Sequence, residues 1–209
     1  MKASTWGKPF TWFKVLVFAA SLIPAARLVI GLFSGGLGAN PVEYITHTTG
    51  TFALVFLMLT LAVTPLRRLT GYASLIRLRR MLGLFAFFYT CVHLSTFVVL
   101  DHFFDPAAIL QDVFKRPYIT AGSVGFLLMV PLAATSTAGM IRRLGGRRWQ
   151  QLHRLVYFSA AAGVIHFLWL VKADLREPLI YAGVLAVLLG YRLAIWRNAP
   201  WAKKRASRP

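Results

Sequence analysis

Six long apolar blocks, separated by charged connections, constrain the fold of this chain more than any other feature. Each block holds about the 20 residues that a helix needs to cross a bilayer core of about 30 Å. Over the whole chain of 209 residues, 57% are hydrophobic. Because a backbone in lipid must satisfy its own hydrogen bonds, we predict an all-α integral membrane protein. The prediction is a single domain, 1–209, built as a six-transmembrane-helix bundle with spans 12–33, 42–64, 81–100, 118–139, 152–171 and 178–196.

Charged residues give these spans a direction. Cations gather in alternate connections and at both ends of the sequence, and all six acids fall on the other side, in the remaining connections or at the edge of a span. Because cytoplasmic loops are rich in lysine and arginine, we predict that the basic side, with both termini, is cytoplasmic. The cations concerned are Lys2, Lys8, Arg67, Arg68, Arg77, Arg79, Arg80, Arg142, Arg143, Arg147, Arg148, Lys203, Lys204, Arg205 and Arg208. The acids are Glu43, Asp101, Asp105, Asp112, Asp174 and Glu177.

The net charge of +18 raises the question of a nucleic-acid partner. The basic residues form short clusters beside the apolar blocks, an arrangement that suits the anionic headgroups of membrane lipid. We therefore predict contact with membrane lipid and no nucleic acid.

Local signals mark where several spans begin and end. Asn40 followed by Pro41 is typical of a helix start, because Asn caps the first turn and Pro fits the first helical position. Thr64-Pro65 is predicted to close the second span. The glycine-rich segment 35–38 predicts a turn. Residues 101–117 carry three of the six acids and are predicted to form the longest loop of the acidic side, where a partner protein would dock.

Histidines are the unusual residues within these blocks. Four of the five lie inside or at the edge of a predicted span, namely His47, His93, His153 and His166. An imidazole in hydrocarbon is costly, so it normally faces the bundle interior as a proton relay, a metal ligand or a haem ligand. At about 1.5 Å per residue, His47, His93 and His166 lie at similar depths of about 9–12 Å from the acidic side. His153 lies near the basic side instead.

His93 and His166 are the best candidates for the ligands of one b-type haem. They occur in the third and fifth blocks at similar depth, so the two imidazoles can face each other across a porphyrin. The alternative is that each imidazole only forms a hydrogen bond across helices. Several histidines at comparable depth favour haem ligation.

His153 poses a different question. Thirteen residues, or about 20 Å of helix, separate it from His166, a spacing that suits two haems stacked across a bilayer. The matching position, thirteen residues before His93, is Arg80, so a second histidine pair lacks a partner. His153 therefore pairs unconventionally, forms a hydrogen bond with a quinone or a flavin, or lies at the membrane interface beside Arg154.

Two further residues are candidates for contacting the cofactor. His47 sits in the polar segment 44–50 and is predicted to be an alternative ligand, a residue behind the ligands, or part of a proton path. Arg27 is the deepest cation of the first block. It suits a haem propionate, or else its side chain extends to the membrane surface.

Several segments resemble a known family, and the resemblance covers nearly the whole chain. The run RRWQQLHRLVY, followed by His166 at thirteen residues from His153, is similar to the ferric-reductase-type transmembrane domain. Within that superfamily, the chain resembles the MsrQ (YedZ) family of haem-binding membrane subunits. The segments that carry this likeness are 35–42, 77–84, 116–119 and 135–137.

The resemblance implies a function. MsrQ proteins belong to the bacterial inner membrane and carry electrons from respiratory quinones to MsrP, a periplasmic molybdenum enzyme that reduces methionine sulfoxide in proteins. The resemblance therefore implies a multi-pass inner-membrane protein that pairs with MsrP as a heterodimer, with heme b and FMN as cofactors. It implies His93, His153 and His166 as the histidines involved. It also implies an electron-transfer subunit whose terminal catalysis lies in the partner, so no catalytic residue is predicted in this chain.

Two other classes of function stay open from the residues alone. A stand-alone quinone-linked or metal reductase would need its own electron supply, and the sequence shows no glycine-rich nucleotide fingerprint. A transporter or an assembly factor would use the histidines as a proton relay, although the sequence shows neither repeat symmetry nor broken helices. A colourless purified protein would favour this last class.

Overall fold

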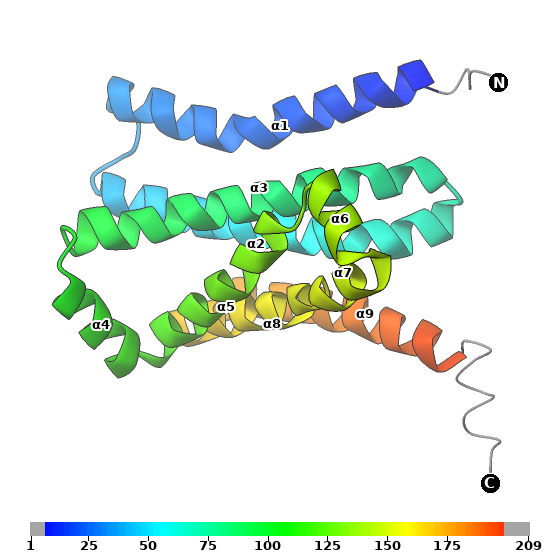
Figure 1. Cartoon of the computed structure of the whole chain (residues 1–209). Helices are drawn as coiled ribbons and strands as arrows, with labels where there is room; N and C mark the ends of the chain where they lie inside the picture. Colours follow the sequence, from blue (N-terminus) through cyan, green and yellow to red (C-terminus); the bar gives the residue numbers. More distant parts are fainter. Residues whose placement is uncertain (1–6, 199–209) are drawn as a thin grey trace, which may run out of the picture.

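The structure, a computed structural model, describes residues 7–198 of the chain, and no β-strand occurs within them (Figure 1). Lys2 and the cations of the tail, Lys203, Lys204, Arg205 and Arg208, lie outside the described residues. The long helices are α1 Gly7–Ser34, α2 Pro41–Thr70, α3 Ile76–Ser95, α5 Pro117–Ala134, α8 Leu155–Leu170 and α9 Arg176–Asn198. The shorter ones are the 3-10 turn η1 Ala73–Leu75, the π-helical segment η2 Thr96–Asp101, α4 Pro106–Lys115, α6 Ala138–Leu144 and α7 Gly146–Leu152.

Five helices of the described range are long and apolar enough to cross a membrane, compared with the six spans that the sequence predicts. The five are Phe10–Ser34, Pro41–Thr70, Ala73–Asp101, Pro117–Ala134 and Arg176–Arg197. The remaining candidate, α8, has 16 residues, or about 24 Å of helix. It is shorter than the predicted span 152–171 because α7 ends at Leu152 and a turn follows before α8 begins. The count of six therefore stays a prediction.

The long helices form a bundle in which successive members run in opposite directions (Figure 1). α2 packs along α3, and α5 packs along α8, while α9 contacts both α8 and α2. The start of α1 and the end of α9 lie at the same end of the bundle as the arginine-rich α2–α3 connection, which we call the basic end. Helix α4 lies at the opposite end, which we call the α4 end.

The predicted start of the second span is confirmed, whereas its predicted end is wrong. Asn40 caps α2 by accepting a hydrogen bond from the Glu43 amide, with Pro41 at the first helical position. At the other end, α2 continues through Pro65 to Thr70. A proline inside a helix lacks the N–H that would bond the carbonyl four residues earlier, here the carbonyl of Leu61.

Arg192 of α9 supplies the donor that Pro65 lacks. Its Nη2 donates to the Leu61 carbonyl over 2.8 Å, and its Nη1 donates to the Tyr157 hydroxyl. Membrane helices tolerate proline where a neighbouring helix satisfies the released carbonyl in this way. The contact ties α2, α8 and α9 together near the basic end.

A second proline inside a helix lies where α1 contacts α3. Pro24 lies inside α1, and the Tyr89 hydroxyl of α3 bonds to backbone groups of α1 near this proline. The hydroxyl donates to the Ser21 carbonyl over 2.7 Å and accepts from the Ala25 amide over 3.2 Å. Tyr89 is only 1% exposed and stacks on Phe56 of α2, with ring centres 5.4 Å apart. The aromatic core therefore holds the first helix in place.

The predicted loop 101–117 is largely helical. The chain reverses at Phe103 and Phe104, whose φ angles of 47° and 62° are uncommon for bulky residues. Asp105 then caps α4 by accepting from the amides of Ala107 and Ala108. The sequence contained this signal, because Asp105-Pro106 has the same cap chemistry as Asn40-Pro41.

The predicted fourth span, 118–139, ends earlier than expected, at Ala134. Two hydroxyls fold back onto the last turn: Thr135 donates to the Pro131 carbonyl and Ser136 to the Leu132 carbonyl, both over 2.6 Å. Thr137 then caps the separate helix α6 through the Met140 amide. Such side-chain bonds compete with helix continuation, and here they place a break near the basic end.

Candidate functional site

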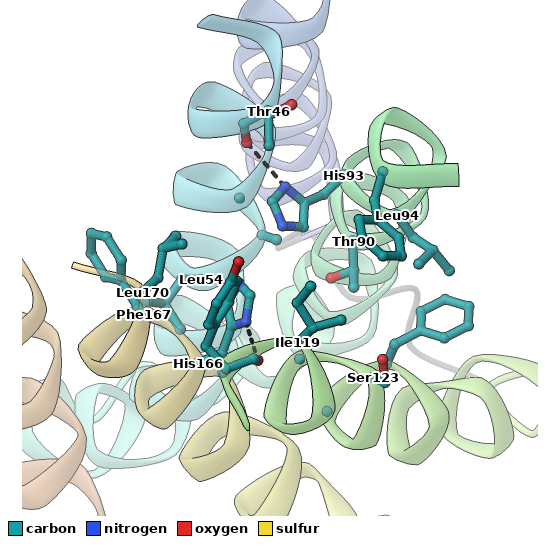
Figure 2. Close-up of a pocket in the computed structure, with 18 of the residues that line it drawn as sticks. Thr46, Leu54, Thr90, His93, Leu94, Ile119, Ser123, His166, Phe167 and Leu170 are labelled. Atoms are coloured by element: carbon teal, nitrogen blue, oxygen red, sulfur yellow. Dashed lines mark hydrogen bonds between the residues drawn. The ribbon is translucent and has the colours of Figure 1, made fainter. Parts of the chain in front are cut away.

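A cavity of about 580 Å³ lies between α2, α3, α5 and α8, and it extends to α4 (Figure 2). Most of its lining is apolar, including Leu54, Phe126, Met129 and Phe167. Polar and charged side chains of the lining concentrate at the α4 end, where Asp101, His102, Asp112, Arg116 and Tyr118 are found. A largely apolar cavity with a few convergent polar groups is typical of a cofactor site.

His93 of α3 reaches this cavity with its ring orientation fixed. Its Nδ1 donates to the Thr46 carbonyl of α2 over 3.0 Å (Figure 2). A carbonyl can only accept, so the proton of the neutral ring lies on Nδ1 and the Nε2 lone pair is exposed to another partner. The π-helical segment η2 begins three residues later, and its first residue, Thr96, donates to the His93 carbonyl over 2.7 Å.

His166 of α8 is held in the same manner from the other side. Its Nδ1 donates to the Tyr118 carbonyl at the start of α5 over 2.6 Å (Figure 2). Among the residues that the structure describes, Nε2 of neither His93 nor His166 has a hydrogen-bond partner. Ligating histidines commonly donate their second nitrogen to a carbonyl or carboxylate, which fixes the tautomer and makes the ligand more basic.

The two imidazoles face each other at a separation that suits a shared metal ion. Their ring centres are 6.0 Å apart and their planes are inclined by 81°. Metal–imidazole bonds are about 2 Å long, so an ion bound by both Nε2 atoms would separate the ring centres by about 6 Å. The structure brings together the two residues predicted as a haem-ligand pair.

Two glycines make room for these rings. A Cβ atom at Gly50 of α2 would lie 3.0 Å from Cε1 of His93, and a Cβ atom at Gly122 of α5 would lie 2.8 Å from Nδ1 of His166. Both separations are shorter than ordinary carbon contacts, so each imidazole packs against a backbone that has no side chain at that point. The sequence analysis singled out neither glycine for this role.

The residues present fit a haem. The cavity offers two neutral imidazoles with Nε2 available, an apolar lining for a porphyrin, and a polar end for its carboxylates. A bare metal site fits less well, because the described residues contain no group of three or more histidine, cysteine, aspartate or glutamate side chains that could hold an ion.

A chain of polar contacts crosses the α4 end of the cavity. His102 donates from Nδ1 to the Phe97 carbonyl over 3.0 Å, and its Nε2 lies 3.2 Å from the Asp112 carboxylate. The same carboxylate pairs with Nε of Arg116 at 3.2 Å, and Arg116 donates from Nη1 to the Tyr118 hydroxyl over 3.2 Å. The bond to Tyr118 and the neighbouring Asp112 charge raise the pKa of Arg116, which keeps its guanidinium protonated.

Two residues predicted to contact the cofactor differ in where the structure places them. His47 lines the cavity on the same face of α2 as Gly50. Arg27 lies on the exposed face of α1 and is absent from the cavity lining. The structure does not bring Arg27 to the cavity, because α1 packs outside the helices that enclose it.

His153 is not brought to the cavity either. It follows α7, where its Nε2 lies 3.1 Å from the Thr135 hydroxyl, and its ring stacks on Trp149 with centres 3.8 Å apart. Nε1 of Trp149 donates to the Thr135 carbonyl over 2.9 Å. Arg79 of α3 lies within electrostatic range of His153. These residues form a separate polar cluster near the basic end.

Comparisons with known proteins show the family to which the chain belongs. The family described as ferric reductase like transmembrane component matches residues 49–164. A relative from Herminiimonas arsenicoxydans is 53% identical over 196 residues, which cover 93% of this chain and 88% of the relative. One from Azospira oryzae is 54% identical over 90% of this chain and 82% of its own length, and one from Bordetella pertussis is 51% identical over 93% of both. All three are named protein-methionine-sulfoxide reductase heme-binding subunit MsrQ.

Proposed function

The chain belongs to the MsrQ family of ferric-reductase-like transmembrane proteins, and we propose that it is the haem-binding membrane subunit of a protein-methionine-sulfoxide reductase system. The observation that carries the proposal is the facing pair His93 and His166, with ring centres 6.0 Å apart and each Nδ1 bound to a backbone carbonyl. In this reading the cavity holds one heme b.

When bound, the haem supplies a carrier for single electrons; the surrounding chain sets its position and its potential. His93 and His166 would hold the iron through Nε2. The carbonyls of Thr46 and Tyr118 prevent the two rings from rotating, and the apolar lining around Leu54 and Phe167 excludes water. Ligand identity, hydrogen bonds to the ligands and burial are the means by which a protein tunes such a centre.

We propose that the electrons come from respiratory quinones and leave to the periplasmic partner MsrP. Reduction of methionine sulfoxide to methionine consumes two electrons and two protons and releases water, and oxidation of a quinol supplies both. Terminal catalysis then lies in the partner, with which this chain forms a heterodimer. This assignment rests on family membership.

We further propose six spans in the bacterial inner membrane, with the basic end in the cytoplasm. The five long apolar helices account for five of these spans, and the shorter helix α8 is the additional one. The arginine-rich connections at the basic end and the acids around α4 support this orientation. A cysteine-accessibility scan tests it: single cysteines in 34–40 should react with a membrane-impermeant reagent in intact spheroplasts, and single cysteines in 67–75 should not.

The acids of the α4 end are not equivalent as docking candidates for MsrP. Asp105 caps α4 and Asp112 bridges His102 and Arg116, so replacing either disturbs the subunit itself. Asp101 is exposed and has neither contact. We expect Asp101→Lys to slow electron delivery to MsrP; because Asp101 also lines the cavity, the haem spectrum measured in parallel separates a docking effect from a change at the haem.

His153 and FMN are proposed to act apart from the haem. We propose that His153 serves electron entry near the basic end, through a quinone or a flavin, and not as a ligand of the haem between His93 and His166. FMN remains an implication of family membership. It is tested by measuring flavin fluorescence after acid release from the purified protein.

The deciding experiment is an absorption spectrum of the detergent-purified protein, oxidised and dithionite-reduced, with haem quantified. His93→Ala and His166→Ala should each lose the sharp reduced b-type bands, and His153→Ala should keep them. A colourless wild-type protein would contradict the proposal and favour a proton relay. Steady turnover with a quinol and a small acceptor, without MsrP, would favour a stand-alone reductase.

A further inference from the structure

Arg116 is the only lysine or arginine among the described residues that line the cavity. Resting on the proposed haem, we propose that Arg116 binds a propionate of the porphyrin and so directs the carboxylate edge of the haem toward α4. A porphyrin with two carboxylates in an otherwise apolar cavity is most stable with its charges beside the available cation, since an unpaired buried charge is costly.

The guanidinium has donors left for this contact. Arginine carries five N–H groups, and the structure uses one on Asp112 and one on the Tyr118 hydroxyl. Its side chain is 53% exposed, compared with 19% for Asp112. The remaining N–H groups can form the charge-assisted, fork-shaped contact with a carboxylate for which arginine is suited.

The neighbouring acid does not cancel this cation. Asp112 is flanked by His102 on one side and Arg116 on the other, so two donors share its charge. His102 contacts the Phe97 carbonyl with Nδ1 and the Asp112 carboxylate with Nε2. Asp112 therefore fixes the position of Arg116 while the remaining N–H groups of the guanidinium stay available.

The same contact would reach the haem ligand through one residue. Tyr118 accepts from Arg116 with its hydroxyl and from His166 with its backbone carbonyl. A propionate held by Arg116 would therefore be anchored to the segment that sets the orientation of the His166 ring. Arg116, in this role, binds the cofactor and positions its ligand together.

The test is reconstitution of the detergent-purified full-length apoprotein with haem b and, separately, with its dimethyl ester, which lacks both carboxylate charges. Binding is measured by the low-spin absorption bands at increasing porphyrin concentration. The wild type should bind the free acid about tenfold to a hundredfold more tightly than the ester, the range expected for a charge-assisted contact. Arg116→Gln should lose most of that preference while its affinity for the ester is unchanged. Lys115→Gln, the matched neighbour that does not line the cavity, should keep the preference.

Several outcomes would overturn the inference. A free-acid preference that persists in Arg116→Gln would exclude Arg116 as the propionate partner. If Arg116→Gln bound neither porphyrin, the deciding variant would be Arg116→Lys, because it keeps the positive charge. If Arg116→Lys bound the ester and showed no preference for the free acid, the contact would also be excluded. A wild type that shows low-spin bands with neither porphyrin would contradict the proposed function itself, and that result differs from a haem that binds without regard to its carboxylates.

Discussion

The two ends of the bundle both hold histidines bonded to neutral oxygen atoms, but they use different nitrogens. At the cavity, His93 and His166 donate from Nδ1 to carbonyls, so both Nε2 atoms face the enclosed space. Near the basic end, the Nε2 of His153 bonds the Thr135 hydroxyl, whose own proton goes to the Pro131 carbonyl. The His153 ring is also covered by Trp149. The two ends therefore differ in which imidazole nitrogen is occupied by a protein oxygen: Nδ1 in His93 and His166, and Nε2 in His153.

The largest expected effect comes from filling the space behind a ligand ring. Gly122→Ala would place a Cβ atom 2.8 Å from Nδ1 of His166 and displace the imidazole from its carbonyl. We expect haem content after purification to fall at least about tenfold, the size of effect seen when a partner behind a metal ligand is lost. Gly183→Ala in α9, where no atom lies within 4 Å, is the control and should keep its haem.

Gly50→Ala should have the same effect at His93 but smaller, because its nearest contact, at 3.0 Å, is with the ring carbon Cε1. Haem content measured in parallel with Gly122→Ala gives the ranking. Full haem content in both variants would mean that the rings are not held against these backbones, and the contrast between the two ends would lose its basis.

Substitutions near the basic end should change the stability of the protein and not its haem content. Arg192→Met removes the donor to the Leu61 carbonyl and should cost about 1–3 kcal/mol of unfolding free energy, the penalty of an unsatisfied buried group. Adding Pro65→Ala restores an N–H for that carbonyl and should recover part of the loss. Thermal unfolding in detergent measures both, with the exposed Arg197→Met as control. No recovery in the double variant would contradict the compensation between Pro65 and Arg192.

A smaller effect is expected at the His153 cluster. Thr135→Val removes the hydroxyl that bonds His153 and should cost about 1 kcal/mol of stability, the net value of one hydrogen bond. The reduced haem bands should be unchanged. Ser136→Ala, whose hydroxyl bonds only the carbonyl of Leu132 in the preceding turn, is the matched control. A shift of the haem bands in Thr135→Val alone would place His153 nearer the haem than the structure has it.

The smallest effect concerns α4. Asp105→Ala removes its N-cap and should cost about 0.5–2 kcal/mol, confined to this helix. Faster hydrogen exchange in residues 107–110, with α5 unchanged, is the expected readout. Asp101→Ala should leave exchange in α4 as it is.

The sequence predicted those parts of the site that depend on long-range patterns. Apolar block length and alternating charge sufficed to place His93 and His166 at similar depth in the third and fifth spans. The break at Thr135–Thr137 and the continuation of α2 through Pro65 were missed, because both depend on contacts formed only after folding: hydroxyl bonds to the last turn in one case and Arg192 from a distant helix in the other.

Arg27 and Arg116 show that the sequence alone also did not identify which cation lines the cavity. Depth along the chain favoured Arg27, but depth does not say which face of a helix meets the cavity, and α1 lies outside it. Arg116 lies in a segment predicted to be a loop, so the sequence pattern did not indicate that its side chain lines the cavity. The roles of Gly50 and Gly122 could not be predicted either, because each depends on an imidazole that packs against the glycine only in the folded protein.

Both imidazoles of the cavity are held by carbonyl oxygens of Thr46 and Tyr118, and every amino acid has a carbonyl. Side chains at these two positions can therefore change over generations without loss of the acceptor, provided that the helices keep their course. The path of the backbone therefore sets the orientation of the two imidazoles. The residue types at positions 46 and 118 can change or serve other functions. Insertions or deletions that rotate α2 or α5 are the changes that such a site cannot absorb.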